Sequence, residues 1–370
     1  MSSLRRILYR KSFWFLFLLG LNLATGQMPF DQPFSAFLSL VLLGFVWIWY
    51  DPFPSDAFIW GLGFSLGYFG VTFIWIMDPF LVEPRKTGWL APGALLCMVG
   101  LLSLILSMCF FLAAILGNGK SQNQRIIILF LFFSLSELIR SDLLLGFPWG
   151  LISSMWINTP ISQMLALFGP FCLSCCTILS AFLITRFWFG SVLGVGILLV
   201  MLGYGYNRLG SPIFERPNPI KVRIVQPNIK QAEKWEPALA PVHLKKHIGL
   251  SKSAKENGID LIIWPETATS YGIDQENKLR DLIADSLGVA LILGSRRFDD
   301  KNKNLYNSAF MLAENGDILD VYDKIKLVPF GEYIPFGKLL NRINIFGFAT
   351  DGLTGFSSGE SIGLFKTNNA

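Results

Sequence analysis

Three charged residues in the second half of the chain stand at the ends of short segments, where they could do acid–base chemistry. Glu266 follows the apolar run 261–264 through a proline, Lys324 ends the segment VYDK, and Glu332 lies in LVPFGEY. A glutamate held beside a lysine can serve as a general base while the lysine ammonium stabilises an oxyanion. Such a pair still needs a nucleophile. A single acid after a strand is more often a helix cap or an ion-pair partner, so the catalytic interpretation requires that these side chains meet.

The segments that would position these residues alternate between strand and helix patterns. Layered α/β domains have this alternation, and their functional residues gather at strand ends. Glu266 would then lie at the tip of a central strand, with Lys324 and Glu332 at later strand ends. Strands are predicted at 221–229, 260–266, 289–297, 307–313 and 318–328, helices at 236–258 and 276–288, and a hairpin turn at 314–317.

The first half of the chain has the composition of a membrane protein. The whole sequence is 52% hydrophobic and 15% charged, but residues 1–207 hold only 10 Lys/Arg and 7 Asp/Glu. We therefore predict a transmembrane domain at 1–207 and a polar globular domain at 220–370. Apolar stretches long enough to span a bilayer, about seven in number, are found at 12–26, 34–50, 57–77, 89–117, 125–139, 161–185 and 188–206.

The orientation of the spans follows from the basic N-terminus, which contains Arg5, Arg6, Arg10 and Lys11. Basic flanks favour the cytoplasm, so seven crossings would place the polar domain on the far side. The first span has no clear cleavage site and is read as an anchor rather than a signal peptide. Glu137 and Arg140 would share a helix face beside the GFPWG loop, either as a pair that anchors this loop or as a lip that contacts a lipid.

Several motifs carry a resemblance to a known family. WPET at 264–267, YNSA at 306–309 and YDKIKLVPFGEYIP at 322–335 resemble the nitrilase superfamily. The LVPFGEYIP string, the QPNI motif at 226–229, and the GFPW loop among several spans narrow the resemblance to the apolipoprotein N-acyltransferase family. It implies an α/β/β/α sandwich, here incomplete, after the membrane domain. It also implies that Glu266 is the general base, Lys324 stabilises the oxyanion, Glu332 supports the site and Trp235 lies beside the substrate pocket.

The resemblance further implies the substrates and the compartment. Members of the family transfer an acyl chain from a phospholipid, usually phosphatidylethanolamine, through an enzyme cysteine to the amino group of a diacylglyceryl-modified apolipoprotein. This would place the chain in the bacterial inner membrane, with the nitrilase-like domain in the periplasm. No cofactor or metal is expected. The net charge of +5 is spread over both halves, which does not indicate a nucleic-acid partner.

The nucleophile is where the sequence departs from the family pattern. The family places a Cys-Tyr-Glu motif after the LVPFGEY loop, and these 370 residues contain none. The five cysteines, at 97, 109, 172, 175 and 176, lie in apolar segments that disfavour a thiolate. We therefore expect a C-terminally truncated form. It would be a fragment, an inactive product or one half of a split enzyme. A membrane-tethered amidase or nitrilase is the remaining alternative.

Two histidines complete the set of candidate residues. His243 and His247 are four apart in HLKKH, which is a metal-ligand spacing, but no third ligand accompanies them. We predict that they lie on a solvated helix face.

Overall fold

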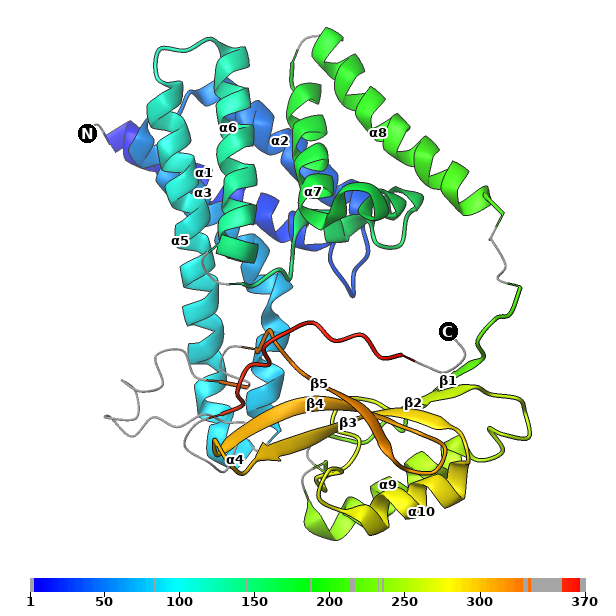
Figure 1. The fold of residues 1–370 in the computed structure, drawn as a ribbon. Coiled ribbons are helices and arrows are strands. Elements are labelled where there is room, and N and C mark those ends of the chain that lie inside the picture. Colours follow the sequence, from blue (N-terminus) through cyan, green and yellow to red (C-terminus); the bar gives the residue numbers. More distant parts are fainter. Residues whose placement is uncertain are drawn as a thin grey trace. The chain divides into compact units, whose positions relative to one another are not determined.

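The computed structural model describes residues 3–82, 84–143, 146–186, 188–212, 217–231, 233–234, 236–328, 332–333 and 355–366. The chain divides into two compact units, Met1–Ile213 and Phe214–Ala370 (Figure 1). We call them the helical unit and the sheet unit.

The helical unit contains seven long helices in its described part, and each coincides with one of the apolar stretches found in the sequence. Three of them begin at a start signal in the sequence: a proline opens α2 and α3, and Ser121 forms a capping box with Gln124 at the start of α6. The helices are α1 (Ser3–Ala24), α2 (Pro33–Tyr50), α3 (Pro54–Thr72), α5 (Ala91–Gly117), α6 (Gln122–Leu138), α7 (Leu165–Ile184) and α8 (Trp188–Gly210), with the short α4 (Pro84–Thr87) before α5.

Among the residues that the structure describes, four helical stretches are long and apolar enough to cross a membrane on their own: Pro33–Tyr50, Gly88–Gly117, Pro160–Ile184 and Trp188–Gly210. A fifth span results if Pro54–Thr72 is joined to Ile74–Leu81 across a 42° bend. Within the described residues, Ser12–Ala24 is a shorter apolar helix and α6 has 17 residues. The structure thus shows several membrane-length helices, and the number seven stays a prediction.

The helical unit is held together by aromatic packing and by close helix contacts. Phe110 and Phe133, both fully buried, meet edge to face with ring centroids 5.8 Å apart. Gly67 lets α3 approach α1 closely, since a Cβ there would lie 2.2 Å from the carbonyl oxygen of Phe17. Small residues commonly serve this purpose between membrane helices.

Glu137 and Arg140 form a buried ion pair at the end of α6, with Nη2–Oε1 at 2.8 Å and side-chain exposures of 3% and 2%. The guanidinium also donates to the carbonyl oxygens of Trp149 at 2.7 Å and Gly150 at 2.5 Å. Glu137 Oε2 accepts the backbone N–H of Ile152 at 2.9 Å. Of the two interpretations of this pair, the anchor for the GFPWG loop is the one with contacts in the structure.

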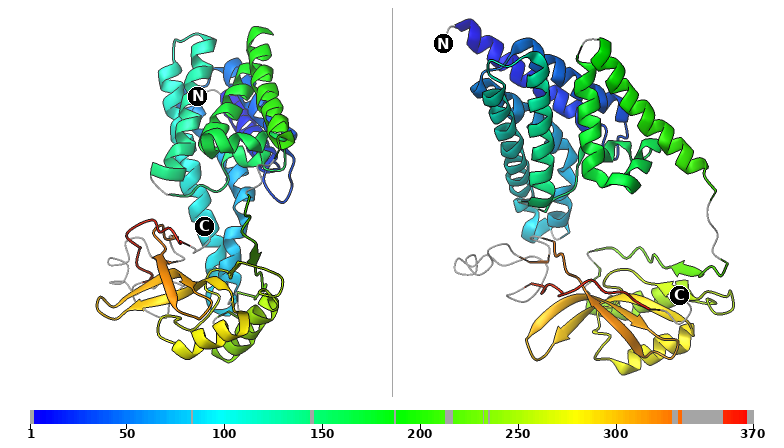
Figure 2. Two further views of the ribbon diagram at one scale, coloured as in Figure 1. Left: turned by 45° about the vertical axis from the view of Figure 1, so that its right-hand side comes forward. Right: turned by 45° about the horizontal axis from the view of Figure 1, so that its top comes forward.

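The described part of the sheet unit forms a mixed five-stranded sheet in the order β1-β2-β3-β4-β5, shown in two further views in Figure 2. The first three strands run parallel, and β3–β4 and β4–β5 are antiparallel. The strands are β1 (Val222–Ile224), β2 (Leu261–Ile263), β3 (Ala290–Asp299), β4 (Asn304–Leu312) and β5 (Ile318–Asp323).

Two helices, α9 (Ala240–Ser251) and α10 (Asn277–Leu287), lie side by side against the sheet (Figures 1 and 2). Ile262, Leu293 and Phe310 form the centre of the core and are fully buried. Gly288 closes α10 in the left-handed conformation, as a C-terminal glycine commonly does.

Two local predictions for this unit are wrong. The helix expected over 236–258 ends at Ser251, because the backbone of Lys252 is extended. His243 and His247 are buried rather than solvated, and the ring of His247 lies 5.0 Å from that of Trp264.

Candidate active site

Glu266, Lys324 and Glu332 meet at one end of the sheet, as the sequence suggested. Glu266 lies three residues after the end of β2, Lys324 follows β5 directly, and Glu332 lies eight residues further along the chain. Lys324 Nζ is 2.8 Å from Glu332 Oε1 and 3.5 Å from Glu266 Oε1. The lysine therefore bridges the two carboxylates.

Asn307 on β4 completes this cluster, and sequence reasoning did not assign it a role. Its side-chain amide donates to Glu266 Oε1 and, at 2.9 Å, to Glu332 Oε1. The backbone carbonyl oxygen of Asn307 also accepts the backbone N–H of Lys324 at 2.9 Å. The YNSA motif could have indicated this role, because the side-chain amide of Asn307 lies in a largely apolar strand and must find hydrogen-bond partners there. We call Glu266, Asn307, Lys324 and Glu332 the acid–base cluster.

The two carboxylates of the acid–base cluster are exposed to different degrees. The side chain of Glu266 is 61% exposed, whereas that of Glu332 is 12% exposed and that of Lys324 30%. Glu332 also accepts the backbone N–H of Val328 through Oε2 at 2.7 Å. Glu332 is thus fixed on both oxygens, while Glu266 is open to an incoming group.

The charges of the cluster stabilise one another. Partial burial acts to lower the pKa of Lys324, but the hydrogen bond to Glu332 and the charges of both glutamates outweigh it, and this pKa is raised. Burial likewise acts to raise the pKa of Glu332, but hydrogen bonds from Lys324, Val328 and Asn307 outweigh it, and this pKa is lowered. The cluster therefore favours an ammonium and a carboxylate over their neutral forms.

The loop that carries Glu266 is seated on β3 through a glycine. A Cβ at Gly294 would lie 2.6 Å from the Cα of Glu266 and 2.5 Å from the amide nitrogen of Thr267. Two backbone hydrogen bonds fix this contact, from Gly294 to the Pro265 carbonyl at 3.2 Å and from Ala268 to the Gly294 carbonyl at 2.8 Å. Gly294 is thus required for the position of Glu266 after β2.

Lys234 is a further cation beside Glu266 that sequence reasoning missed. Its ammonium donates to the backbone carbonyl of Glu266 at 3.1 Å. Burial lowers the pKa of Lys234, and the charge of Glu266 partly opposes that shift. The neighbouring Trp235, expected beside the substrate pocket, lies outside the described residues.

Asp323 does not belong to the acid–base cluster although it precedes Lys324. It pairs with Arg297 at 2.5 Å and accepts a hydrogen bond from Ser308 at 2.6 Å. Neighbours along a strand point to opposite faces, which explains this separation.

Two family models match the chain, one in each unit. The model of the apolipoprotein N-acyltransferase N-terminal domain matches residues 19–183, and the model of carbon-nitrogen hydrolases matches residues 221–353. Curated relatives called apolipoprotein N-acyltransferase align with most of the chain. The one from Sinorhizobium fredii is 29% identical over 93% of this chain and 69% of its own length. The one from Brucella suis is 30% identical over 89% of this chain and 66% of its own length. This chain belongs to the apolipoprotein N-acyltransferase family, within the nitrilase superfamily.

The apolipoprotein N-acyltransferase relatives extend beyond this sequence, which spans about two thirds of their length. Together with the apolar helices, the bacterial relatives indicate a bacterial membrane protein. Crystal structures of an N-terminal amidase match 30% of the chain at 23% identity with a TM-score of 0.23, a similarity too low to bear on the fold.

Proposed function

We propose that the acid–base cluster is the proton-transfer and oxyanion-stabilising part of a lipoprotein N-acyltransferase. Glu266 is the general base, Lys324 stabilises the oxyanion, and Glu332 with Asn307 holds Lys324 in place. The observation that carries this proposal is the asymmetry of the cluster. The glutamate at the strand end is 61% exposed, and its partner is 12% exposed and bonded on both oxygens.

The proposed chemistry has two transfers. Glu266 takes the proton of a thiol, and the thiolate attacks the ester carbonyl of a phospholipid while the ammonium of Lys324 faces the developing oxyanion. The ester bond breaks, the leaving alkoxide takes the proton back, and a thioester remains. The amino group of the acceptor then attacks this thioester, Glu266 takes the amine proton, and the thiol is restored. No residue of this sequence is assigned as the thiol.

The substrates and the membrane placement belong to the same proposal. The acyl donor is a phosphatidylethanolamine-like phospholipid, and the acceptor is a diacylglyceryl-modified apolipoprotein. The helical unit would cross the inner membrane seven times, with the domain boundaries at 1–207 and 220–370 and the sandwich domain in the periplasm. The seven long helices and the basic N-terminus support this arrangement. Trp235 would border the substrate pocket.

Replacement of the lysine tests the proposal. Lys324→Met in the protein purified from its native membrane should lower transfer of a labelled acyl chain from phospholipid to a diacylglyceryl lipopeptide by about 10²–10³-fold. Lys245→Met is the matched control, because this lysine is exposed on α9. Equal transfer by the Lys324 variant and the wild type would refute the proposal. So would ammonia release from small amides without acyl transfer, which identifies an amidase, or lipoprotein binding without any transfer, which identifies a non-catalytic protein.

A further inference from the structure

The segment that carries the proposed general base has a strained residue directly after Glu266. Thr267 has a φ of 51°, in the left-handed region, where a β-branched residue is rarely found. Such a conformation costs free energy and persists only where neighbouring groups fix it. The peptide group that joins Glu266 to Thr267 is one of the planes that define this φ angle. Contacts to this peptide group therefore determine the turn and, with it, the position of Glu266.

Groups from two different elements hold this peptide group. Gly294 on β3 lies against its nitrogen, since a Cβ at Gly294 would be 2.5 Å from the amide nitrogen of Thr267. The ammonium of Lys234 donates to its oxygen, the carbonyl of Glu266, at 3.1 Å. The N–H of Ala268, one residue further on, donates to the Gly294 carbonyl at 2.8 Å. The strained turn thus lies between β3 and the side chain of Lys234.

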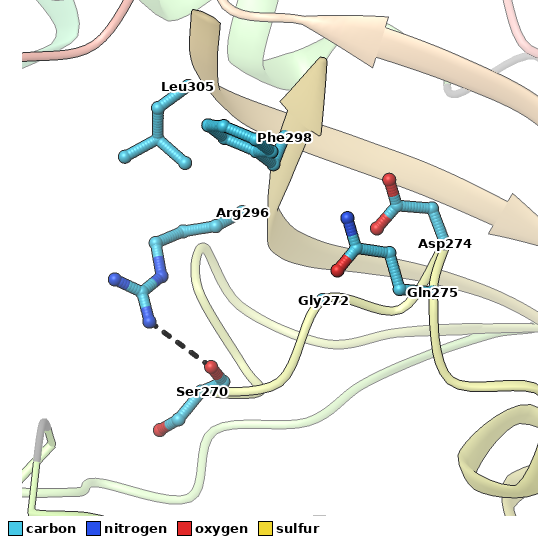
Figure 3. Close-up of a pocket in the computed structure, with 7 residues that line it drawn as sticks. All are labelled: Ser270, Gly272, Asp274, Gln275, Arg296, Phe298 and Leu305. Carbon is cyan, nitrogen blue, oxygen red and sulfur yellow. Dashed lines mark hydrogen bonds between the residues drawn. The ribbon is translucent and has the colours of Figure 1, made fainter. Parts of the chain in front are cut away.

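Lys234 contacts the same segment at a second point. Its backbone carbonyl accepts the hydroxyl of Ser270 at 3.2 Å. The carbonyl of Ser270 in turn accepts a hydrogen bond from Arg296 on β3 at 3.2 Å, drawn as a dashed line in Figure 3. The side chain of Lys234 therefore binds residue 266 and its backbone binds residue 270. These two contacts enclose the strained turn at Thr267.

The segment that carries Lys234 is itself held in place. It follows β1, and the N–H of Val225 at the end of that strand donates to the carbonyl of Ile263 on β2 at 2.9 Å. A turn precedes the lysine, in which the N–H of Glu233 donates to the carbonyl of Lys230 at 3.0 Å. Lys234 is half-buried, and a half-buried ammonium needs acceptors to offset its lost hydration. The carbonyl at the strained turn supplies one.

We propose that Lys234 is a positioning residue for Glu266, because its ammonium holds the Glu266–Thr267 peptide group and thereby keeps the carboxylate beside Lys324. Two lysines then fix the residue at different atoms. Lys324 lies 3.5 Å from the carboxylate, and Lys234 lies 3.1 Å from the backbone carbonyl. The effect on catalysis rests on the proposed function, in which Glu266 is the base. The anchoring of the segment itself requires no acyl transfer.

Hydrogen–deuterium exchange of the full chain in detergent, followed by mass spectrometry, tests the anchoring without any substrate. Lys234→Met should speed exchange in the peptide covering 264–270 by about 10–100-fold, because the loss of a hydrogen bond from a charged donor lets the segment open more often. Lys234→Arg retains the charge and the donors and should keep most of the protection. Lys230→Met is the matched control, since this side chain is 80% exposed in the same turn, and should exchange like the wild type.

Steady-state acyl transfer separates positioning from substrate binding. In Lys234→Met, kcat for transfer of a labelled acyl chain to a diacylglyceryl lipopeptide should fall by about 10–100-fold, because a small displacement of the base weakens catalysis. KM should stay near the wild-type value, and Lys234→Arg should restore most of kcat. A raised KM with unchanged kcat and unchanged exchange would show that Lys234 binds substrate, which would overturn the proposal.

A second variant keeps the test decisive if Lys234→Met fails to fold. Ser270→Ala removes the hydroxyl that donates to the Lys234 carbonyl and leaves the Ser270 carbonyl available to Arg296. It should speed exchange of the 264–270 peptide by about 3–10-fold, because a neutral hydrogen bond is lost. Exchange at the wild-type rate in Ser270→Ala, or in folded Lys234→Met, would overturn the proposal.

Glu266→Gln distinguishes a failure of this inference from a failure of the proposed function. Lys234 contacts the backbone of Glu266, so this variant should exchange like the wild type over 264–270. Wild-type transfer by Glu266→Gln, with faster exchange in Lys234→Met, would refute the proposed function and support the anchoring. Lost transfer in Glu266→Gln, with wild-type exchange and wild-type kcat in Lys234→Met, would support the proposed function and refute this inference.

Discussion

Two glutamate–cation groups among the described residues, one in each unit, differ in how much of their hydrogen-bonding capacity is unused. In the helical unit, Glu137 and Arg140 are 3% and 2% exposed, and backbone groups of the next loop take up their remaining hydrogen bonds. In the sheet unit, Lys324 bridges two carboxylates, and one of these, on Glu266, is 61% exposed. The same residue types thus form a closed structural pair in one unit and an open cluster in the other.

Solvent exposure separates the structural ion pair from the candidate chemical group in this protein. A buried pair that loses one member leaves an uncompensated charge, so it acts through stability. An exposed carboxylate beside an ammonium has a small desolvation cost, and it can exchange protons with an incoming group. Exposure and unused acceptors therefore indicate chemistry better than the presence of a pair does.

The largest expected effect on stability is at the buried pair. Arg140→Met should destabilise the helical unit by about 3–5 kcal/mol, because Glu137 stays buried without its partner. Thermal unfolding in detergent, followed by circular dichroism, measures this change. Arg85→Met is the control, because Arg85 is exposed on α4. An unchanged melting temperature of the Arg140 variant would show that the Glu137–Arg140 pair does not stabilise the helical unit.

The next effect is at the glycine beneath Glu266. Gly294→Ala should cost about 1–3 kcal/mol, because the added Cβ overlaps the backbone of Glu266 and Thr267. The loop must shift, so acyl transfer should fall as well. Gly249→Ala, on α9 with no neighbouring atom outside the helix backbone within 4 Å of the new Cβ, should not destabilise the protein, because alanine favours a helix, and should leave transfer at the wild-type rate. Wild-type transfer by Gly294→Ala would mean that the position of Glu266 does not matter.

A smaller effect is the pH dependence of stability in the sheet unit. The pKa of Lys324 is raised, so its contribution is complete below the ordinary value of 10.5 and is lost as pH rises through the raised value. The pKa of Glu332 is lowered, so its contribution is complete above the ordinary value of 4.5 and is lost as pH falls through the lowered value. We expect a plateau between these limits in denaturant midpoints measured against pH.

Glu332→Gln separates the two limbs of this profile. The variant should lose less stability at low pH, because Glu332 no longer takes up a proton there. Its stability should begin to fall at a lower alkaline pH than that of the wild type, because Lys324 loses its nearest carboxylate. Glu256→Gln, at an exposed position after α9, should retain both limbs. Identical pH profiles of stability for the two variants would show that the titrations of Glu332 and Lys324 do not influence each other.

The sequence predicted much of the fold because strong local signals agree with the tertiary structure. Proline starts, a capping box and a glycine end bound the helices, and short apolar runs form β2 and β3. The meeting of Glu266, Lys324 and Glu332 could also be predicted, since all three follow strand ends.

The remaining features depend on contacts between distant segments. The register that pairs Arg296 with Asn307, and the packing of Gly294 beneath Glu266, join residues from different elements and leave no local pattern. His247 was mispredicted because its burial depends on Trp264, 17 positions away. Lys234 was missed because a lysine in a polar loop is usually solvated.

Acyl transfer by Glu266→Gln, measured on protein whose melting temperature is recorded in parallel, tests whether Glu266 is the general base. Because Glu266 is largely exposed, the substitution should change stability by no more than about 0.5–1 kcal/mol. Transfer of a labelled acyl chain to a diacylglyceryl lipopeptide should nevertheless fall by about 10²–10⁴-fold. A variant that melts like the wild type and transfers the acyl chain at the wild-type rate would contradict the assignment of Glu266 as the general base.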